Sequence, residues 1–171
     1  MSAKKLSRDQ KRKQRKQKRA QHQKQATLSS QYRPMLRRLQ EAGWGDQKIV
    51  YNPPGYDKMS AVLLDFIRPY YEYATTTEAM HKLITTALVA WNTALLPEAE
   101  QDESLQQVSQ ALPAEVVEDF YAIVREMIER KNKYYAQYKR HILDYTLTET
   151  EDNYHVSVIS IVDPEESDRF E

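Results

Sequence analysis

The spacing of apolar side chains divides the chain into a helical part and a shorter alternating part. Between residues 57 and 141, apolar positions recur every three or four residues, which is the spacing of one face of an α-helix. After residue 143 the period changes to two, which is typical of β-strands. The pattern predicts a mainly α fold, a small helical bundle of about four helices with a C-terminal β-hairpin.

The segment with the widest apolar face is the predicted central helix. It begins at a capping box formed by Thr75 and Glu78 and runs to just before Pro97. Asn92 lies inside it, and we expect its side chain to bond a neighbouring backbone group. A shorter helix, which Pro69 bends or ends, precedes it in the chain.

The last predicted helix is the longest. Pro113 occupies a favourable first position, and no helix breaker follows until about residue 141. The predicted buried stripe of this helix includes Lys131 and three tyrosines near its end. These are Tyr134, Tyr135 and Tyr138.

Alternating segments at residues 143–147 and 154–162 predict the two strands of the hairpin. A two-stranded hairpin is marginally stable alone. We therefore expect it to pack on the helices, or to pair with residues 48–51 as a third strand.

Charge is distributed very unevenly along the chain, although the total is zero. Residues 1–26 contain eleven of the 25 basic residues and one acidic residue, a net charge of +10. Residues 27–171 contain 14 basic and 24 acidic residues, a net charge of −10. We call residues 1–26 the basic arm. It has no apolar face, and like charges four residues apart oppose a helix, so a disordered or fraying helical arm is expected.

The predicted organisation has four parts. The basic arm, an intrinsically disordered region or fraying helix, is followed by a short helix at 31–42 and a linker, which together occupy residues 27–56. The helical domain with its hairpin occupies residues 57–162, and residues 163–171 form a loose acidic tail.

The basic arm predicts an anionic partner, because lysine and arginine neutralise phosphates and release counterions. A second basic cluster, interleaved with tyrosines, lies at the end of the last helix and could contact a nucleic-acid backbone beside stacked bases. The predicted nucleic-acid-binding residues are Lys4, Lys5, Arg8, Lys11, Arg12, Lys13, Arg15, Lys16, Lys18, Arg19 and Lys24 in the arm, and Arg130, Lys133 and Arg140 in the helix.

Each basic cluster also has a simpler interpretation. The arm could be a solvating tail, or it could fold back on the acidic remainder of the chain. The helical phase places Arg130, Lys133 and Arg140 together on a solvated face opposite the buried tyrosines. A membrane surface fits the arm less well, because the arm has no apolar face to insert.

The sequence offers little to support catalysis. Cysteine is absent, which excludes disulfides, thiolate metal sites and a cysteine nucleophile. Glu78 and His81 have the Glu-x-x-His spacing of di-iron bundles, but no second copy occurs, so no metal or other cofactor is expected. His141, Asp144 and His155 could meet as a general-base cluster, yet isolated surface histidines explain them better. We predict no catalytic residues and no enzymatic activity.

The chain also lacks the features of a membrane or secreted protein. Its longest apolar run, residues 83–96, is too short to span a bilayer, and no apolar leader follows the basic start. A cytoplasmic protein without membrane insertion is expected.

Three stretches carry a family resemblance: DKMSAVLLDF (57–66), TTALVAWNTALLPE (85–98) and IERKNKYYAQYKRHILDYTL (128–147). With the Lys/Arg/Gln-rich start, they resemble a family of small uncharacterised bacterial proteins, including cyanobacterial ones, with a basic N-terminal arm and a helical core. The resemblance implies a bacterial cytoplasmic protein, which makes a nuclear localisation signal a poor explanation of the arm. It implies no activity and no site residue.

The sequence thus predicts a non-enzymatic nucleic-acid-binding protein that uses its basic arm for electrostatic contact. RNA is favoured over DNA, and a ribosome or another nucleoprotein is one setting for such a protein. Short basic arms can thread into nucleic-acid grooves as ribosomal-protein tails do. The alternative is a protein–protein adaptor or regulator whose acidic helical body docks a partner, with the arm secondary.

Overall fold

The computed structural model describes residues 37–38, 40–41, 57–150 and 154–161. The chain divides into two compact units, Met1–Asp46 and Gln47–Glu171. In the first unit the four described residues are helical and exposed, within the helix predicted at 31–42, and Arg37 pairs with Glu41 one turn later. The basic arm, the third strand predicted at 48–51 and the acidic tail lie outside the described residues.

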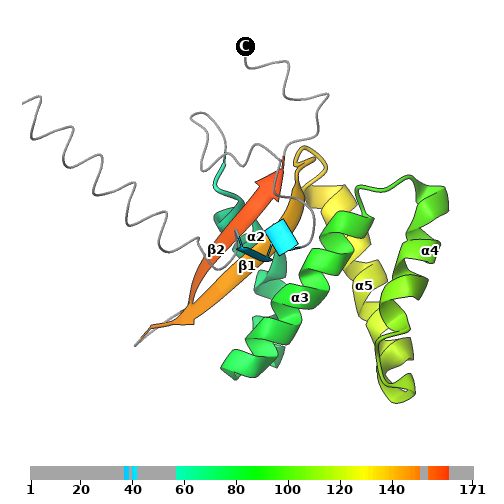
Figure 1. Ribbon diagram of the computed structural model, residues 1–171, viewed down its shortest axis with the longest axis horizontal. Helices are drawn as coiled ribbons and strands as arrows, with labels where there is room; N and C mark the ends of the chain where they lie inside the picture. Colours follow the sequence, from blue (N-terminus) through cyan, green and yellow to red (C-terminus); the bar gives the residue numbers. More distant parts are fainter. Residues whose placement is uncertain (1–36, 39, 42–56, 151–153, 162–171) are drawn as a thin grey trace, which may run out of the picture. The chain divides into compact units, whose positions relative to one another are not determined.

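The second unit confirms the mainly α fold and the C-terminal hairpin. Residues 57–150 and 154–161 form four α-helices, one 3-10 helix and one antiparallel pair of strands (Figure 1). In chain order these are α2 (Met59–Ile67), η1 (Arg68–Tyr73), α3 (Thr77–Thr93), α4 (Glu98–Ser109), α5 (Ala114–Tyr134), β1 (His141–Glu149) and β2 (Tyr154–Ile161).

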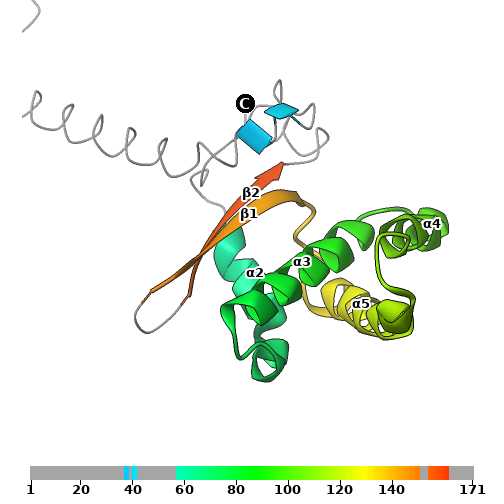
Figure 2. The same cartoon turned by 60° about the horizontal axis from the view of Figure 1, so that its bottom comes forward.

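Helix α3 is the central element, as its apolar face predicted. It contacts α2, η1, α4, α5 and β1, so that the hairpin and α2 lie on one side of it and α4 and α5 on the other (Figure 2). Aromatic rings meet edge to face in this core, with 5.4 Å between the Phe66 and Trp91 ring centroids. The largest fully buried apolar side chains are Trp91, Phe66, Leu63, Ile67, Ile84, Leu105, Met127, Ile142, Ile159 and Val124.

The start of α3 differs in detail from the predicted capping box. Thr76, one residue later than expected, is the N-cap, and its hydroxyl oxygen accepts a hydrogen bond from the Ala79 amide at 3.1 Å. Glu78 bonds Lys82 one turn later instead. Three consecutive threonines could cap this helix, and the Thr77 hydroxyl instead donates to Glu149 Oε2 at 2.7 Å.

The last helix is shorter than predicted, and this changes the placement of Arg140. Helix α5 ends at Tyr134, although neither glycine nor proline follows, and the chain enters β1 at His141. The Trp91 indole Nε1–H donates to the Arg140 carbonyl oxygen at 2.9 Å in the buried interior. That tertiary bond favours an extended backbone at Arg140 and outweighs the local helix propensity.

Asn92 joins the central helix to the first strand. Its side-chain amide donates to the Ile142 carbonyl oxygen at 2.8 Å, and its side-chain oxygen accepts from the Ile142 amide at 2.9 Å. The predicted bond from Asn92 to backbone is thus confirmed, and it is a pair of bonds. The strand irregularity between Ile142 and Asp144 begins at this clamp.

We expect Asn92→Ala to lower the free energy of unfolding by about 1–2 kcal/mol, because both backbone groups of Ile142 lose their partner. Urea unfolding at neutral pH measures the change. Asn132→Ala is the matched control, since Asn132 is an exposed residue of α5 and its replacement should cost nothing. Equal losses in both variants would contradict the role of the clamp.

Candidate nucleic-acid interface

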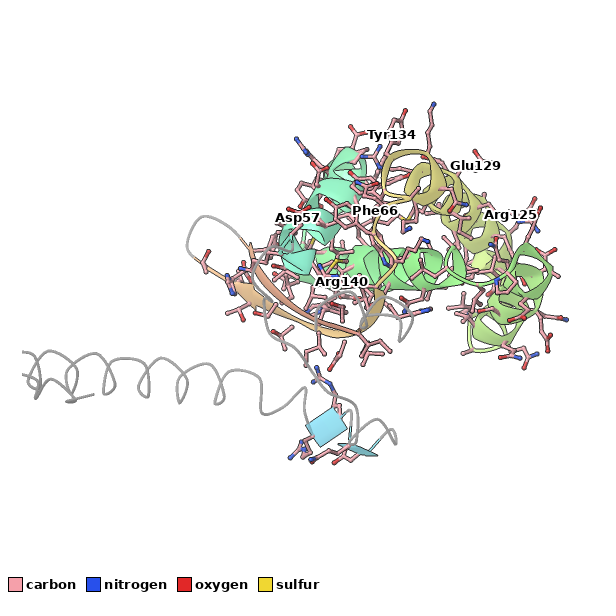
Figure 3. All side chains as sticks on the ribbon, turned by 90° about the horizontal axis from the view of Figure 1, so that it is seen from above. Asp57, Phe66, Arg125, Glu129, Tyr134 and Arg140 are labelled. Carbon is pink, nitrogen blue, oxygen red and sulfur yellow. The ribbon has the colours of Figure 1, made fainter. Side chains whose placement is uncertain are left out.

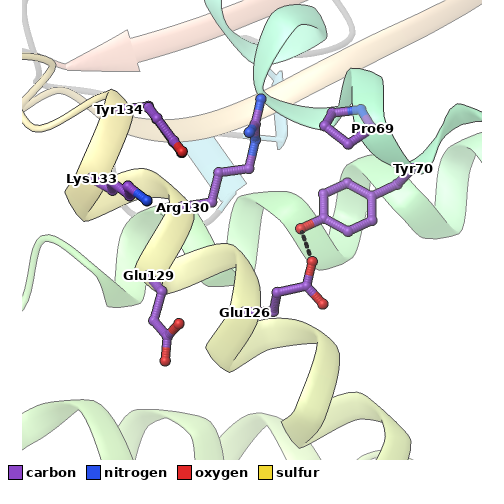
Figure 4. Close-up of a pocket in the computed structure, with 7 residues that line it drawn as sticks. All are labelled: Pro69, Tyr70, Glu126, Glu129, Arg130, Lys133 and Tyr134. Carbon is purple, nitrogen blue, oxygen red and sulfur yellow. Dashed lines mark hydrogen bonds between the residues drawn. The ribbon is translucent and has the colours of Figure 1, made fainter.

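A shallow groove lies where η1 crosses the second half of α5 (Figure 4). Its volume is about 260 Å³. Positions 126, 129, 130 and 133 share one side of α5 because they are three or four residues apart. The lining residues are Pro69, Tyr70, Glu126, Glu129, Arg130, Lys133 and Tyr134.

Tyr134 is the exposed aromatic ring of this groove. It is 55% exposed, whereas the apolar stripe predicted it to be buried, so that prediction is wrong. It lies in the last turn of α5, whereas its neighbour Tyr135 packs on Trp91 of α3, with 6.1 Å between the ring centroids. Arg130 Cζ lies 5.5 Å and Lys133 Nζ 5.1 Å from the Tyr134 ring centroid. The ring and these two cations form what we call the Tyr134 platform.

Glu126 and Glu129 form what we call the acidic wall of the groove, on the same side of α5 as Arg130 and Lys133. The Tyr70 hydroxyl donates to Glu126 Oε1 at 2.8 Å (Figure 4). Burial of the phenol, together with this bond to a carboxylate, raises the pKa of Tyr70 to about 12. Because Tyr70 occupies only one carboxylate oxygen of Glu126, the other oxygen can accept from another donor. Glu129 adds a second, exposed carboxylate.

Arg130 is held in place by bonds inside the unit. Its Nε donates to the Phe66 carbonyl oxygen at 3.0 Å, and its Nη2 donates to the Tyr135 hydroxyl at 3.3 Å. The Tyr135 hydroxyl in turn donates to Asp65 Oδ2 at 2.6 Å. Arg130 is therefore a fixed cation beside the Tyr134 ring, with a smaller part of its hydrogen-bonding capacity left for a ligand.

Arg140 does not lie on a solvated face, and this part of the sequence interpretation is wrong. It is 6% exposed, and its Nη2 donates to the Asp57 carbonyl oxygen at 2.7 Å. Asp57 also accepts from the Tyr138 hydroxyl at 2.6 Å. Figure 3 shows Arg140 inside the unit, whereas Tyr134 and Glu129 lie at its rim. Of the three predicted helix residues, only Arg130 and Lys133 are brought together.

Charge is also separated inside the helical unit. Residues 98–119, which form α4 and the start of α5, contain seven acidic residues and no lysine or arginine. Residues 125–140 contain six basic and two acidic residues. The groove therefore lies at the basic C-terminal end of α5, where cations interact favourably with the helix macrodipole.

The structure does not assemble the histidine cluster. His141 pairs with Ile161 and His155 pairs with Thr148, so the two histidines lie toward opposite ends of the hairpin, about 20 Å apart along the strands. Among residues 57–150 and 154–161, no group of three or more potential metal ligands occurs. His81 bonds the Tyr145 hydroxyl at 3.1 Å.

Sequence reasoning missed the acidic wall of the groove. The spacing of Glu126, Glu129 and Lys133 along α5 is a signal that could have placed them on one side of the helix. Tyr70 carried no such signal, because it reaches Glu126 from 56 residues away.

No protein-family model, curated protein or solved structure matches the chain. The family resemblance of the three stretches therefore stays a prediction. Within the described part of the chain, every helix is too short or too polar to cross a membrane.

Proposed function

We propose that this protein is a non-enzymatic nucleic-acid-binding protein that holds RNA, in preference to DNA, through its basic arm. The observation that carries the proposal is the division of charge, +10 in residues 1–26 against −10 in the remainder. A polymer of phosphates is attracted to the first and repelled by most of the second. The arm then acts as a tether, as in ribosome- or nucleoprotein-associated proteins.

The groove on α5 supports the proposal with a second point of contact. Its exposed Tyr134 ring, with Lys133 and Arg130 beside it, has the chemistry that single-stranded nucleic acids use on proteins, an aromatic face with nearby cations. It also lies on a segment where basic residues outnumber acidic ones, six to two over residues 125–140.

A protein–protein adaptor is the second candidate function. The exposed Val116 and Ile123 lie seven residues apart on α5, which places them on one face of the helix. Val116 itself belongs to the acidic segment 98–119. These features favour a basic protein partner, and binding of such a partner should survive removal of the arm's charge.

The charge of the arm provides the test of the proposed function. Full-length protein is purified beside a variant with the arm's lysines and arginines replaced by glutamine, and the 260/280 nm absorbance ratio is compared before and after a high-salt wash. We expect only the protein with the native arm to purify with bound nucleic acid, and we expect the high-salt wash to remove it. Equal ratios in both proteins before the wash would reject the proposal.

A further inference from the structure

We propose that the groove between η1 and α5 binds one unpaired nucleobase, stacked on Tyr134, and prefers guanine to uracil. This deepens the proposed function and rests on it, because the arm supplies most of the affinity and the groove supplies the preference. The inference comes from three properties of the groove: an exposed ring, its size and its acidic wall.

The Tyr134 platform can hold a base by stacking. The ring is 55% exposed, so a base can stack on the part of it that Arg130 and Lys133 leave uncovered. Lys133 and Arg130 lie within 6 Å of the ring centroid and are positioned to meet the phosphate that accompanies the base. Stacking on an aromatic side chain, with cations for the backbone, is how proteins bind single strands.

The size of the groove favours a single unpaired base. A volume of about 260 Å³ is just below the usual range for small-molecule sites and cannot admit a duplex. A base inside a duplex also has both faces stacked and its pairing edge occupied. An unpaired base can turn out of the strand and present a face to Tyr134.

The acidic wall selects among bases by the hydrogen bonds that their edges offer. Carboxylates only accept, so Glu126 and Glu129 favour an edge that donates. The pairing edge of guanine donates from its ring N–H and from its amino group, which suits a carboxylate with two oxygens. The edge of uracil presents two carbonyl oxygens around a single N–H, and the carboxylates would repel these oxygens. The Tyr70 hydroxyl cannot donate a hydrogen bond to them, because it already donates to Glu126.

The test measures binding of two fluorescent RNA oligonucleotides to the full-length protein by anisotropy. One is a short single-stranded oligouridylate, and the other is the same oligonucleotide with one central guanosine. We expect the guanosine to tighten binding about tenfold, and Tyr134→Ala to remove that gain. Tyr134→Phe keeps the ring and should keep the gain. Glu129→Gln should reduce it, because the amide replaces an acceptor by a donor.

Two outcomes separate this inference from the proposed function. Equal affinity for the two oligonucleotides, or a guanosine preference that survives Tyr134→Ala, overturns the groove assignment even when both RNAs bind. Affinity that is unchanged by glutamine substitution of the arm overturns the proposed function itself. A thermal melt of each variant establishes that the fold is intact, which is expected because Tyr134 and Glu129 are exposed.

Discussion

Replacing the eleven lysines and arginines of residues 1–26 by glutamine should weaken binding of single-stranded RNA by more than about a hundredfold at about 50 mM salt. Each phosphate contact by a cation releases a counterion, which gives a slope of about −0.7 per contact in a plot of log affinity against log salt concentration. If about six arm cations contact phosphates, the native slope is about −4. The variant should have a slope near −1, because few body cations remain available.

A scrambled arm is the matched control for this experiment. It keeps the length, the composition and the eleven positive charges of residues 1–26 but changes their order. Electrostatic contact is blind to sequence, so the scrambled protein should bind RNA with the native affinity and the native salt slope. Loss of binding on scrambling would show that RNA recognises a defined structure of the arm. It would contradict the proposal that the arm is an electrostatic tether.

Replacing Lys131 by methionine should raise the free energy of unfolding at pH 7 by about 2–3 kcal/mol. Lys131 is 2% exposed, and among the residues that the structure describes no carboxylate pairs with it. Burial lowers its pKa to about 8, so the charged form is destabilised in the fold. The Trp91 ring, 4.8 Å from Nζ, offsets part of this cost by a cation–π contact. Methionine has a similar length, carries no charge, and its sulfur can also contact the ring.

The pH dependence of stability gives a second readout for Lys131. Between about pH 8 and pH 10 the unfolded chain holds the lysine proton while the folded protein has released it. The unfolded state thus binds more protons, and the native protein becomes more stable as pH rises. Above about pH 10 the raised pKa of Tyr70 acts in the opposite direction, because the folded state then holds the extra proton.

Urea unfolding of native and Lys131→Met proteins from pH 7 to about 9.5 measures both effects. The rise in stability above pH 8 should be present in the native protein and absent in the variant. Lys82→Met is the control, because Lys82 is exposed and its surface ion pair with Glu78 contributes little to stability. A variant that is less stable than the native protein at pH 7 would show that the Lys131 cation stabilises the fold.

Much of the fold follows from local patterning. The central helix α3 was predictable because its apolar face is wide and continuous, and the hairpin because the apolar period changes from three or four to two. The end of α5 was not predictable, because no residue between Tyr134 and His141 breaks a helix. The bonds that end it, from Trp91 to the Arg140 carbonyl and from Arg140 to Asp57, join segments 49 and 83 residues apart.

The candidate site was also predicted only in part, because it too depends on contacts between distant segments. Lys133 and Arg130 were identified from their charge and their neighbouring tyrosines, but which tyrosine is exposed depends on where α2 and η1 cross α5. The crossing leaves Tyr134 exposed and buries Tyr135 against Phe66, with 5.5 Å between the ring centroids.

The sequence by itself determined the mainly α fold with its hairpin and the division of charge between residues 1–26 and the remainder, because these are properties of composition and of local period. Only the tertiary structure decided that Arg140 is buried, that Tyr134 is exposed, and that Tyr70 bonds Glu126 in the same groove. Those outcomes depend on contacts between distant segments, and the free energy of packing there exceeds the preference of any single residue for helix or for solvent.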